Sequence, residues 1–256
     1  MSSVDRRERL TGRIDDVLIS TRTIPRLAPG SLDRLRNVPD TSSAVSDALD
    51  ELGRGGCVPP AALTSVWGDG VVVVGQSVTL RYRRLDGDVS TNREAGRGRV
   101  FGDRDLYGLV EPGDVAVMDC GGATDAAVVG ALSARWALKA GVAACVVDGA
   151  VRDTASIRDV GLPVWCAGTS PQAARYRLEV AELNGPVDLL GVPVHPGDVV
   201  VADRDGVAVI PVDVVEQVIE HCERGLRDER EMIAIIDAAD GLEDLVARTA
   251  GGAGPT

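Results

Sequence analysis

The chain has 256 residues, enough to bury a substantial core in one large domain. Hydrophobic residues make up 45% of it but aromatic residues only 3%, so we expect a core built from Val, Ala, Leu and Ile. The formal net charge of -12 argues against nucleic acid and anionic membranes as main partners, because phosphate binding is driven by basic surface.

The cysteines and the first residues bear on the compartment. Five cysteines are widely spaced and form no C-x-x-C pair, which favours reduced, mostly buried thiols in a cytosolic protein over a disulfide framework. His195 and His221 are the only histidines, which argues against zinc. No apolar segment of the secretory type follows the first seven residues, and no run is long enough to cross a bilayer. We therefore expect a cytoplasmic protein.

Three N-terminal segments differ in pattern. Residues 4–20 mix Arg and Asp with Leu10, Ile14 and Val17, which predicts an amphipathic helix with one apolar stripe. Residues 23–39 contain three prolines and are typical of a connector. The next segment predicts a helix that ends at Gly53 and is capped by Thr41, Ser42 or Ser43.

Residues 71–83 are apolar at first and then alternate with polar residues, which predicts a strand. Residues 85–105 are rich in Gly, Arg and Asp and predict a long loop. We interpret it as a solvated loop with internal ion pairs. The alternative is a mobile loop whose arginines, Arg93, Arg97, Arg99 and Arg104, close over an anionic substrate.

The middle of the chain predicts a short helical turn at residues 106–111 and a buried strand at residues 115–118. Gly121 and Gly122 allow a sharp turn, after which we expect a helix that begins near residues 124–127 and ends at Ala140. Residues 141–147 are an apolar, β-branched run that suits a second buried strand.

Arg152 and Asp153 follow this second strand, and ligands usually bind at that edge of α/β folds. An arginine can bind a carboxylate through two parallel hydrogen bonds, while an aspartate can hold a hard cation beside it. The alternative is a surface salt bridge at a turn. Asp148 precedes a glycine, which predicts a structural residue that ties its own turn.

The C-terminal half predicts strands at residues 162–167, 191–194, 198–202 and 207–210, with a hairpin turn at Asp205 and Gly206. His195 ends one of these strands and is interpreted as structural. A long helix is expected from Asp213 to Ile236, with Glu216 as the partner in a capping box. Residues 238–256 predict a short helix and a flexible tail.

Five blocks of the chain carry a family resemblance. They are P-G-D-V-A-V-M-D from Pro112, A-V-V-G-A-L from Ala127, V-V-D-G-A-V-R-D from Val146, L-P-V-W-C-A-G from Leu162 and the run of residues 191–211. The chain thereby resembles the RraA-like family, which includes the regulator of ribonuclease activity A and class II 4-hydroxy-4-methyl-2-oxoglutarate aldolases. The resemblance implies an α/β fold of the "swivelling" β/β/α type, with central β-layers flanked by helices. We expect this domain to span residues 41–237, after a helical extension and connector at residues 1–40.

The resemblance also implies a site around Arg152 and Asp153. In the family, N–H groups just after the A-V-x-G turn bind a 2-oxo acid, which by position points to Gly130, Ala131, Leu132 and Ser133 as substrate-binding residues. Unpaired N–H donors at a helix start suit a developing oxyanion.

The chain departs from the aldolases at Ala131, where they have a Glu or Asp that holds metal-bound water. Asp153 alone is then the expected metal ligand, for Mg²⁺ or Mn²⁺. Asp119 and Asp125 are candidate substitutes, and the alternative for each is a structural loop or capping acid.

The family further implies a homotrimer or a dimer of trimers. Aldolase-type relatives contribute a Glu from the C-terminal helix to a neighbouring subunit's site, and Glu231 is the best match, with Glu229 second. A solvated helix face is the alternative for both. Together these features predict a lyase that cleaves a C–C bond of a small 2-oxo acid through a metal-stabilised enolate, with Arg152, Asp153 and Glu231 as catalytic residues. Two alternatives are altered, metal-independent chemistry on a carboxylate substrate and a non-catalytic protein-binding regulator.

Overall fold

The structure is a computed structural model that describes residues 8–54, 56–68 and 70–250. Its centre is a run of four parallel strands, β3 (Val73–Arg84), β4 (Val115–Val129), β5 (Ala144–Val151) and β6 (Val164–Thr169). Antiparallel strands extend this sheet at both edges: β10 (Val199–Ala202), β11 (Val207–Ile210), β1 (Cys57–Val58), β2 (Thr64–Ser65) and β7 (Leu178–Leu183). A separate two-stranded sheet contains β8 (Val187–Leu189) and β9 (Val192–Val194).

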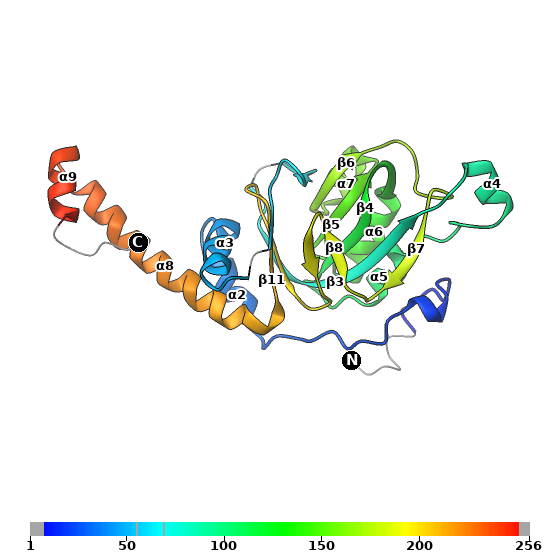
Figure 1. The fold of residues 1–256 in the computed structure, drawn as a ribbon, viewed down its shortest axis with the longest axis horizontal. Coiled ribbons are helices and arrows are strands. Elements are labelled where there is room, and N and C mark those ends of the chain that lie inside the picture. The colour runs from blue at the N-terminus through cyan, green and yellow to red at the C-terminus, as the bar shows by residue number, and fades with distance from the viewer. Residues whose placement is uncertain (1–7, 55, 69, 251–256) are drawn as a thin grey trace.

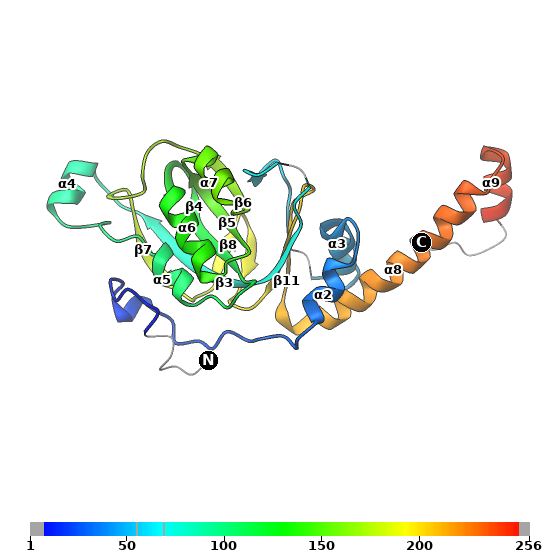
Figure 2. The ribbon, with the colours of Figure 1, turned by 180° about the vertical axis from the view of Figure 1, so that it is seen from behind.

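The sheet is bent so that its strands form two β-layers, each covered by helices on its outer side (Figures 1 and 2). On one side α5 (Asp103–Gly108), α6 (Ala131–Ala140) and α7 (Thr154–Val160) cover the parallel strands. On the other side α2 (Ser31–Arg36), α3 (Thr41–Glu51) and α8 (Val215–Asp237) cover β10 and β11. The predicted α/β fold with central β-layers and flanking helices is confirmed.

Side-chain alternation in the strands explains this layering. In β5, Cys145 and Val147 face the layer of α5 to α7, whereas Ala144 and Val146 face the space between the β-layers. All eight residues of β5 are buried, because apolar residues on both faces pack against other elements. Buried strands with this continuous apolar pattern are the ones that the sequence predicts best.

The structure corrects the prediction for residues 115–140. β4 does not end at Met118, and no helix begins near residues 124–127; the strand extends to Val129 and α6 begins at Ala131. Gly121 and Gly122 have left-handed φ values of 59° and 69°, and the pairing register with β5 shifts beyond Asp119. The two glycines therefore form a bulge within the strand and not a reversal of the chain.

The predicted helix at residues 4–20 is wrong over the described part, which starts at residue 8. Only a 3₁₀ turn, η1 (Asp16–Leu18), is present there. Ile14 is buried in the core, and the N–H and hydroxyl of Thr11 both donate to Asp105, so tertiary contacts hold this segment in an irregular, non-helical path. The predicted connector contains α2 as well.

Two further predictions, a loop and a helix cap, change for the same reason. Residues 85–105 contain α4 (Val89–Glu94) and the start of α5, and no ion pair joins two residues of this range. α3 is confirmed, but its N-cap is Asp40, and Ser42 instead donates from its N–H and hydroxyl to Asp203, at 3.0 and 2.6 Å. A side chain elsewhere in the fold thus replaces the predicted local cap.

α8 follows a 3₁₀ turn, η2 (Val212–Val214), and runs to Asp237 as predicted, while α9 (Leu242–Thr249) is the predicted short extra helix. The capping box is wrong, because Asp213 pairs with Arg54 and Glu216 pairs with Arg34. The second half of α8 extends away from the sheet and ends in α9 (Figure 1). Residues 251–256 of the predicted tail lie outside the described residues.

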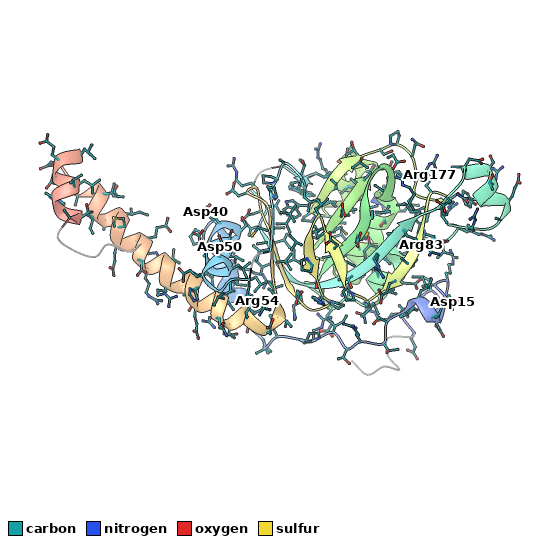
Figure 3. All side chains as sticks on the ribbon, in the orientation of Figure 1. Asp15, Asp40, Asp50, Arg54, Arg83 and Arg177 are labelled. Carbon is teal, nitrogen blue, oxygen red and sulfur yellow. The ribbon has the colours of Figure 1, made fainter. Side chains whose placement is uncertain are left out.

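No helix in the described residues is long and apolar enough to cross a membrane. All five cysteines are free thiols; Cys57 is exposed and the other four are buried, as predicted for most of them. Figure 3 places Arg83 and Arg177 at the end of the molecule near α4, whereas Asp40, Asp50 and Arg54 lie at the side of α3 and α8.

Candidate functional site

The ends of two neighbouring parallel strands bring the predicted site residues together. The N–H of Arg152 donates to the carbonyl oxygen of Val129 at 2.9 Å, which joins the end of β5 to the end of β4. The two segments that follow, Gly130 with the first turn of α6 and Arg152 with Asp153, therefore lie side by side. We call this group, Gly130 to Ser133 with Arg152 and Asp153, the candidate site.

Gly130 is the point of closest approach within the candidate site. A Cβ atom at this position would lie 2.9 Å from Oδ2 of Asp153 and 3.2 Å from Cγ of Arg152. The backbone of Gly130 is extended, with φ at -146°, so space and not conformation explains why a glycine stands here. Its missing side chain leaves room for Arg152 and Asp153 to pack directly against the start of α6.

The first turn of α6 presents backbone N–H donors at this edge. The first N–H groups of a helix have no acceptor inside the helix, and they carry the positive end of its dipole. The N–H of Ala131 donates to Oδ2 of Asp153 at 3.2 Å. Leu132 is 69% exposed, while Ser133 is buried beneath the turn. A carboxylate or an oxyanion is the kind of group that this turn binds.

The side chains of Arg152 and Asp153 are half-exposed to solvent at the candidate site. Nε of Arg152 lies 3.8 Å from Oδ2 of Asp153, and the side chains are 43% and 46% exposed. Asp153 has a left-handed φ of 56° at the N-cap of α7, a conformation that Asp tolerates better than most residues. The guanidinium and the carboxylate are thus both accessible to a small molecule.

The donors present suit a weakly held, hydrated divalent cation. Within the described residues, no group of three His, Cys, Asp or Glu side chains is arranged to hold a metal ion. Asp153 offers one accessible carboxylate, and Mg²⁺ accepts one protein carboxylate when water and substrate complete its shell. The site fits that ion and does not fit zinc, which takes several nitrogen or sulfur ligands.

Asp119 and Asp125, the two substitutes considered from the sequence, have structural roles. Asp119 accepts hydrogen bonds from the N–H groups of Gly121, at 2.9 Å, and Asp188, at 3.1 Å. Asp125 pairs with Arg84 at the surface. The structure thus agrees with the structural alternative for both residues.

Asp148 is buried but does not tie its own turn, so that detail of the prediction is wrong. Its Oδ2 accepts from the N–H of Gly122 in the β4 bulge, at 3.1 Å. Burial raises the pKa of Asp148 to about 6; the bond from Gly122 opposes this, and the nearby charges of Asp119 and Asp188 add to it.

Comparison with known families decides the classification. Residues 42–209 match the sequence profile of the family described as RraA-like: Aldolase/RraA, which is well over half of the chain. The chain belongs to the RraA-like family.

Three proteins illustrate the range of relatives that are similar to this chain. Protein DlpA of Legionella pneumophila is 34% identical over 204 residues, which cover 79% of this chain and 30% of DlpA. The 4-hydroxy-4-methyl-2-oxoglutarate aldolase of Thermus thermophilus is 33% identical over 144 residues, covering 54% of this chain and 85% of that protein. The third is Streptomyces coelicolor RraAS2, described as an unusual member of the RNase ES inhibitor RraA protein family. Its crystal structure superposes on this chain with a TM-score of 0.66 at 28% identity, and the match covers 82% of this chain and 98% of RraAS2.

The match to the first of these relatives is partial along its length. The chain spans 30% of DlpA, and it spans 56% of a further relative from Halalkalibacterium halodurans, also named for 4-hydroxy-4-methyl-2-oxoglutarate aldolase. Family membership and fold are therefore established, and the activity of this RraA-like protein is a separate question.

The structure separates one predicted residue from the rest. Glu231 and Glu229 lie exposed on the part of α8 that extends away from the sheet, so within one chain neither is part of the candidate site. Ala131 is the first residue of α6, and its methyl group offers no carboxylate at the candidate site.

A second layer of residues, which no sequence pattern predicts, lies behind the candidate site. Asp103 and Tyr107 of α5 lie against Ser133, and the hydroxyl groups of Tyr107 and Ser133 are 2.9 Å apart. The guanidinium of Arg104 lies 5.2 Å from the ring centre of Trp136 on α6. Nothing local in the sequence connects positions about thirty residues apart, so only the packing of α5 against α6 could reveal them.

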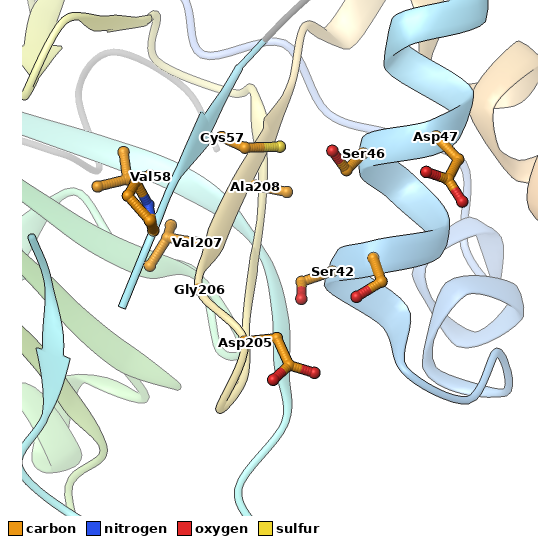
Figure 4. A pocket seen from close by; sticks show the side chains of 11 residues that line it. Ser42, Ser46, Asp47, Cys57, Val58, Asp205, Gly206, Val207 and Ala208 are labelled. Atoms are coloured by element: carbon orange, nitrogen blue, oxygen red, sulfur yellow. The ribbon is translucent and has the colours of Figure 1, made fainter. Parts of the chain in front are cut away.

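A cavity of about 340 Å³ lies elsewhere, between α3 and the strands β1 and β11. Ser46, Asp47, Cys57 and Asp205 line it (Figure 4). It contains none of the predicted site residues, so the strand-end geometry and not cavity size identifies the candidate site.

Proposed function

We propose that this RraA-like protein is a lyase that cleaves a C–C bond of a small 2-oxo acid, by retro-aldol cleavage or by decarboxylation of the oxaloacetate type. The observation that carries the proposal is the meeting of Arg152 and Asp153 with the first turn of α6 across Gly130. The site combines the guanidinium of Arg152, the carboxylate of Asp153 and the N–H donors at the start of α6. This combination suits a substrate that carries a carboxylate beside a keto group.

Each residue of the candidate site has a role in this proposal. Arg152 binds the substrate carboxylate through paired hydrogen bonds. The N–H groups of Leu132 and Ser133 stabilise the negative charge that develops on the keto oxygen when the neighbouring C–C bond breaks. The same developing charge arises in retro-aldol cleavage and in decarboxylation, so one arrangement serves both reactions.

Asp153 would hold a divalent cation, Mg²⁺ or Mn²⁺, which when bound supplies Lewis-acid stabilisation to the carboxylate and keto oxygens of the substrate. The related proteins named as 4-hydroxy-4-methyl-2-oxoglutarate aldolases support a lyase of this kind. Because Ala131 offers no carboxylate, this protein lacks one group that could relay a proton, so proton transfer depends on water or on another subunit.

A second copy of the chain is the proposed source of the missing acid. α8 and α9 expose the apolar side chains Ile233, Ile236, Leu242 and Val246 on the part that extends from the domain. Such surfaces mark interaction sites. In a homotrimer or a dimer of trimers, this segment would cover a neighbour's candidate site and bring Glu231, or Glu229, to it.

The test is decarboxylation of oxaloacetate by the purified protein with Mg²⁺, Mn²⁺ or EDTA. We expect metal-dependent turnover that falls by about a hundredfold or more in Asp153→Ala, the loss that removal of one group stabilising developing charge causes. Asp159→Ala is the matched control, because Asp159 is an exposed acid of the adjoining helix α7. Ala131→Asp should raise turnover, and Glu231→Ala should lower it. Turnover that is equal in Asp153→Ala and wild type would refute the proposed role of Asp153.

A non-catalytic regulator of another protein is the second candidate. The similarity to RraAS2, from a family described by RNase ES inhibition, favours it, as does the loss of the carboxylate at position 131. No turnover and no binding of pyruvate by the wild-type protein, with any of the metals, would favour this function over the lyase.

A further inference from the structure

A buried carboxyl group lies directly beneath the first turn of α6. Asp103 is the first residue of α5 and is only 4% exposed, and its Oδ1 has no hydrogen-bond donor among the described residues. The side chain of Ser133, from α6, lies beside Asp103 and lowers its pKa, and the hydroxyl of Tyr107 lies 2.9 Å from that of Ser133. A chain of polar groups therefore connects α5 to the turn that carries the proposed substrate-binding amides.

An unsatisfied buried carboxyl oxygen costs free energy, so its presence needs a reason. Burial raises the pKa of Asp103, and the nearby hydroxyl of Ser133 and the adjacent backbone and charge of Arg104 lower it only in part. The other titratable groups that face it are Tyr82 of β3, Tyr107 of α5 and Cys145 of β5, all buried and all with raised pKa values. The charge of Arg104 acts on Asp103 and lowers its pKa.

The position of Asp103 sets up a competition between two anions. The positive end of the α6 dipole attracts a negative charge from either side of the first turn. A substrate carboxylate would approach this turn from the solvent side, while Asp103 lies behind it in a poorly hydrated environment where charges interact strongly. When Asp103 is ionised it repels the substrate anion, and when it is protonated that repulsion disappears.

We propose that Asp103 is a positioning residue of the candidate site, which holds the first turn of α6 through Ser133 and sets by its charge how tightly that turn binds a carboxylate. This inference rests on the proposed function, because the turn must bind the substrate anion. By linkage, the affinity for the anion rises as the pH falls and Asp103 gains its proton, and binding of the anion favours that protonation.

Asp105 provides a matched control on the same helix. It is as buried as Asp103, at 1% exposure, but its carboxylate accepts from the N–H and the hydroxyl of Thr11 in the N-terminal segment. A change at Asp105 therefore alters a buried carboxylate of α5 without touching Ser133. Ser133→Ala removes the connecting hydroxyl and keeps the backbone N–H.

The first measurement is the Kd of pyruvate, with Mg²⁺ present, by calorimetry between pH 5 and 8. We expect wild-type affinity to increase as the pH falls. Asp103→Asn keeps a hydrogen-bond acceptor for Ser133 and removes the charge, so it should bind pyruvate about tenfold more tightly at pH 8, a coupling within the usual range for two linked groups. It should also lose most of the pH dependence. Asp105→Asn should keep the wild-type pH profile, even if it is less stable.

The second measurement does not need a substrate. Hydrogen exchange of the N–H groups of residues 131–134 should be faster in Ser133→Ala and Asp103→Ala than in wild type, and unchanged in Asp103→Asn and Asp105→Asn. If the wild-type protein binds no pyruvate, the proposed function fails, and with it the effect of Asp103 on binding, while the exchange result still decides its effect on the turn. If wild type binds pyruvate and Asp103→Asn keeps the wild-type affinity and pH profile, the inference about Asp103 alone is overturned.

Discussion

Replacement of Gly130 by alanine is the most direct test of the candidate site. The added Cβ would lie 2.9 Å from Oδ2 of Asp153, 3.2 Å from Cγ of Arg152 and 3.3 Å from its Nε. The first distance is shorter than a non-bonded contact between a Cβ atom and an oxygen atom allows, so both side chains must move by a few tenths of an ångström. They are half-exposed and can move at little cost, so the free energy of unfolding should fall by about 1 kcal/mol, the low end for overpacking.

Activity should suffer more than stability in this variant. A misplacement of about 1 Å can cost a hundredfold in rate, so a shift of a few tenths should lower kcat/KM for oxaloacetate by about tenfold. Gly225→Ala is the control, because Gly225 lies within α8 with no atom near its Cβ position and should be neutral or stabilising. Full activity in a folded Gly130→Ala protein would refute the site geometry, as would global unfolding of that variant.

Two further predictions concern stability away from the candidate site. Asp148→Asn should increase the free energy of unfolding at pH 8 by up to about 3 kcal/mol, as measured by urea titration. The reason is that the pKa of Asp148 in the folded state, about 6, lies above its ordinary value of 3.8, so the ionised side chain destabilises the wild-type protein at this pH. The stability that wild type has when Asp148 is protonated is lost as the pH rises from about 4 through about 6, so the variant should show a flatter pH profile; equal profiles would contradict this. Ser42→Ala should cost about 1–3 kcal/mol, because it leaves the buried carboxylate of Asp203 short of a donor, whereas Ser43→Ala, at an exposed position of the same turn, should change thermal stability little.

Strong local patterns account for the parts of the fold that could be predicted. The β-branched run before Asp148 predicts β5, and the rule that ligands bind at strand ends places Arg152 and Asp153 at an edge, where the structure has them. By contrast, Gly121 and Gly122 adopt left-handed conformations that suit a reversal and a bulge equally well. Only pairing of the following residues with β5 favours the bulge, and that pairing is not visible in the local sequence.

The N-terminal segment shows the opposite error. Its apolar spacing fits a helix, but Ile14 gains more by burial in the core, and the hydrogen bonds of Thr11 to Asp105 fix an irregular, non-helical path. Asp103 and Ser133 are a comparable case at the candidate site, because their contact depends on how α5 packs against α6. Sequence patterns thus predict which segments are buried, whereas contacts between distant segments decide their conformation and the residues behind the site.

The irregular half of β4 has a consequence for how proteins with this fold can diversify. Between Asp119 and Val129 the strand takes ten residue steps, while its partner takes three from Asp148 to Val151. The pairing is restored at the end by the bond from Arg152 to Val129. The exposed positions of this excursion, such as Thr124 and Asp125, can therefore be exchanged while the strand end keeps its alignment. The surface around the candidate site can therefore change in shape and charge during evolution, while the backbone that carries Arg152 and Asp153 stays in place.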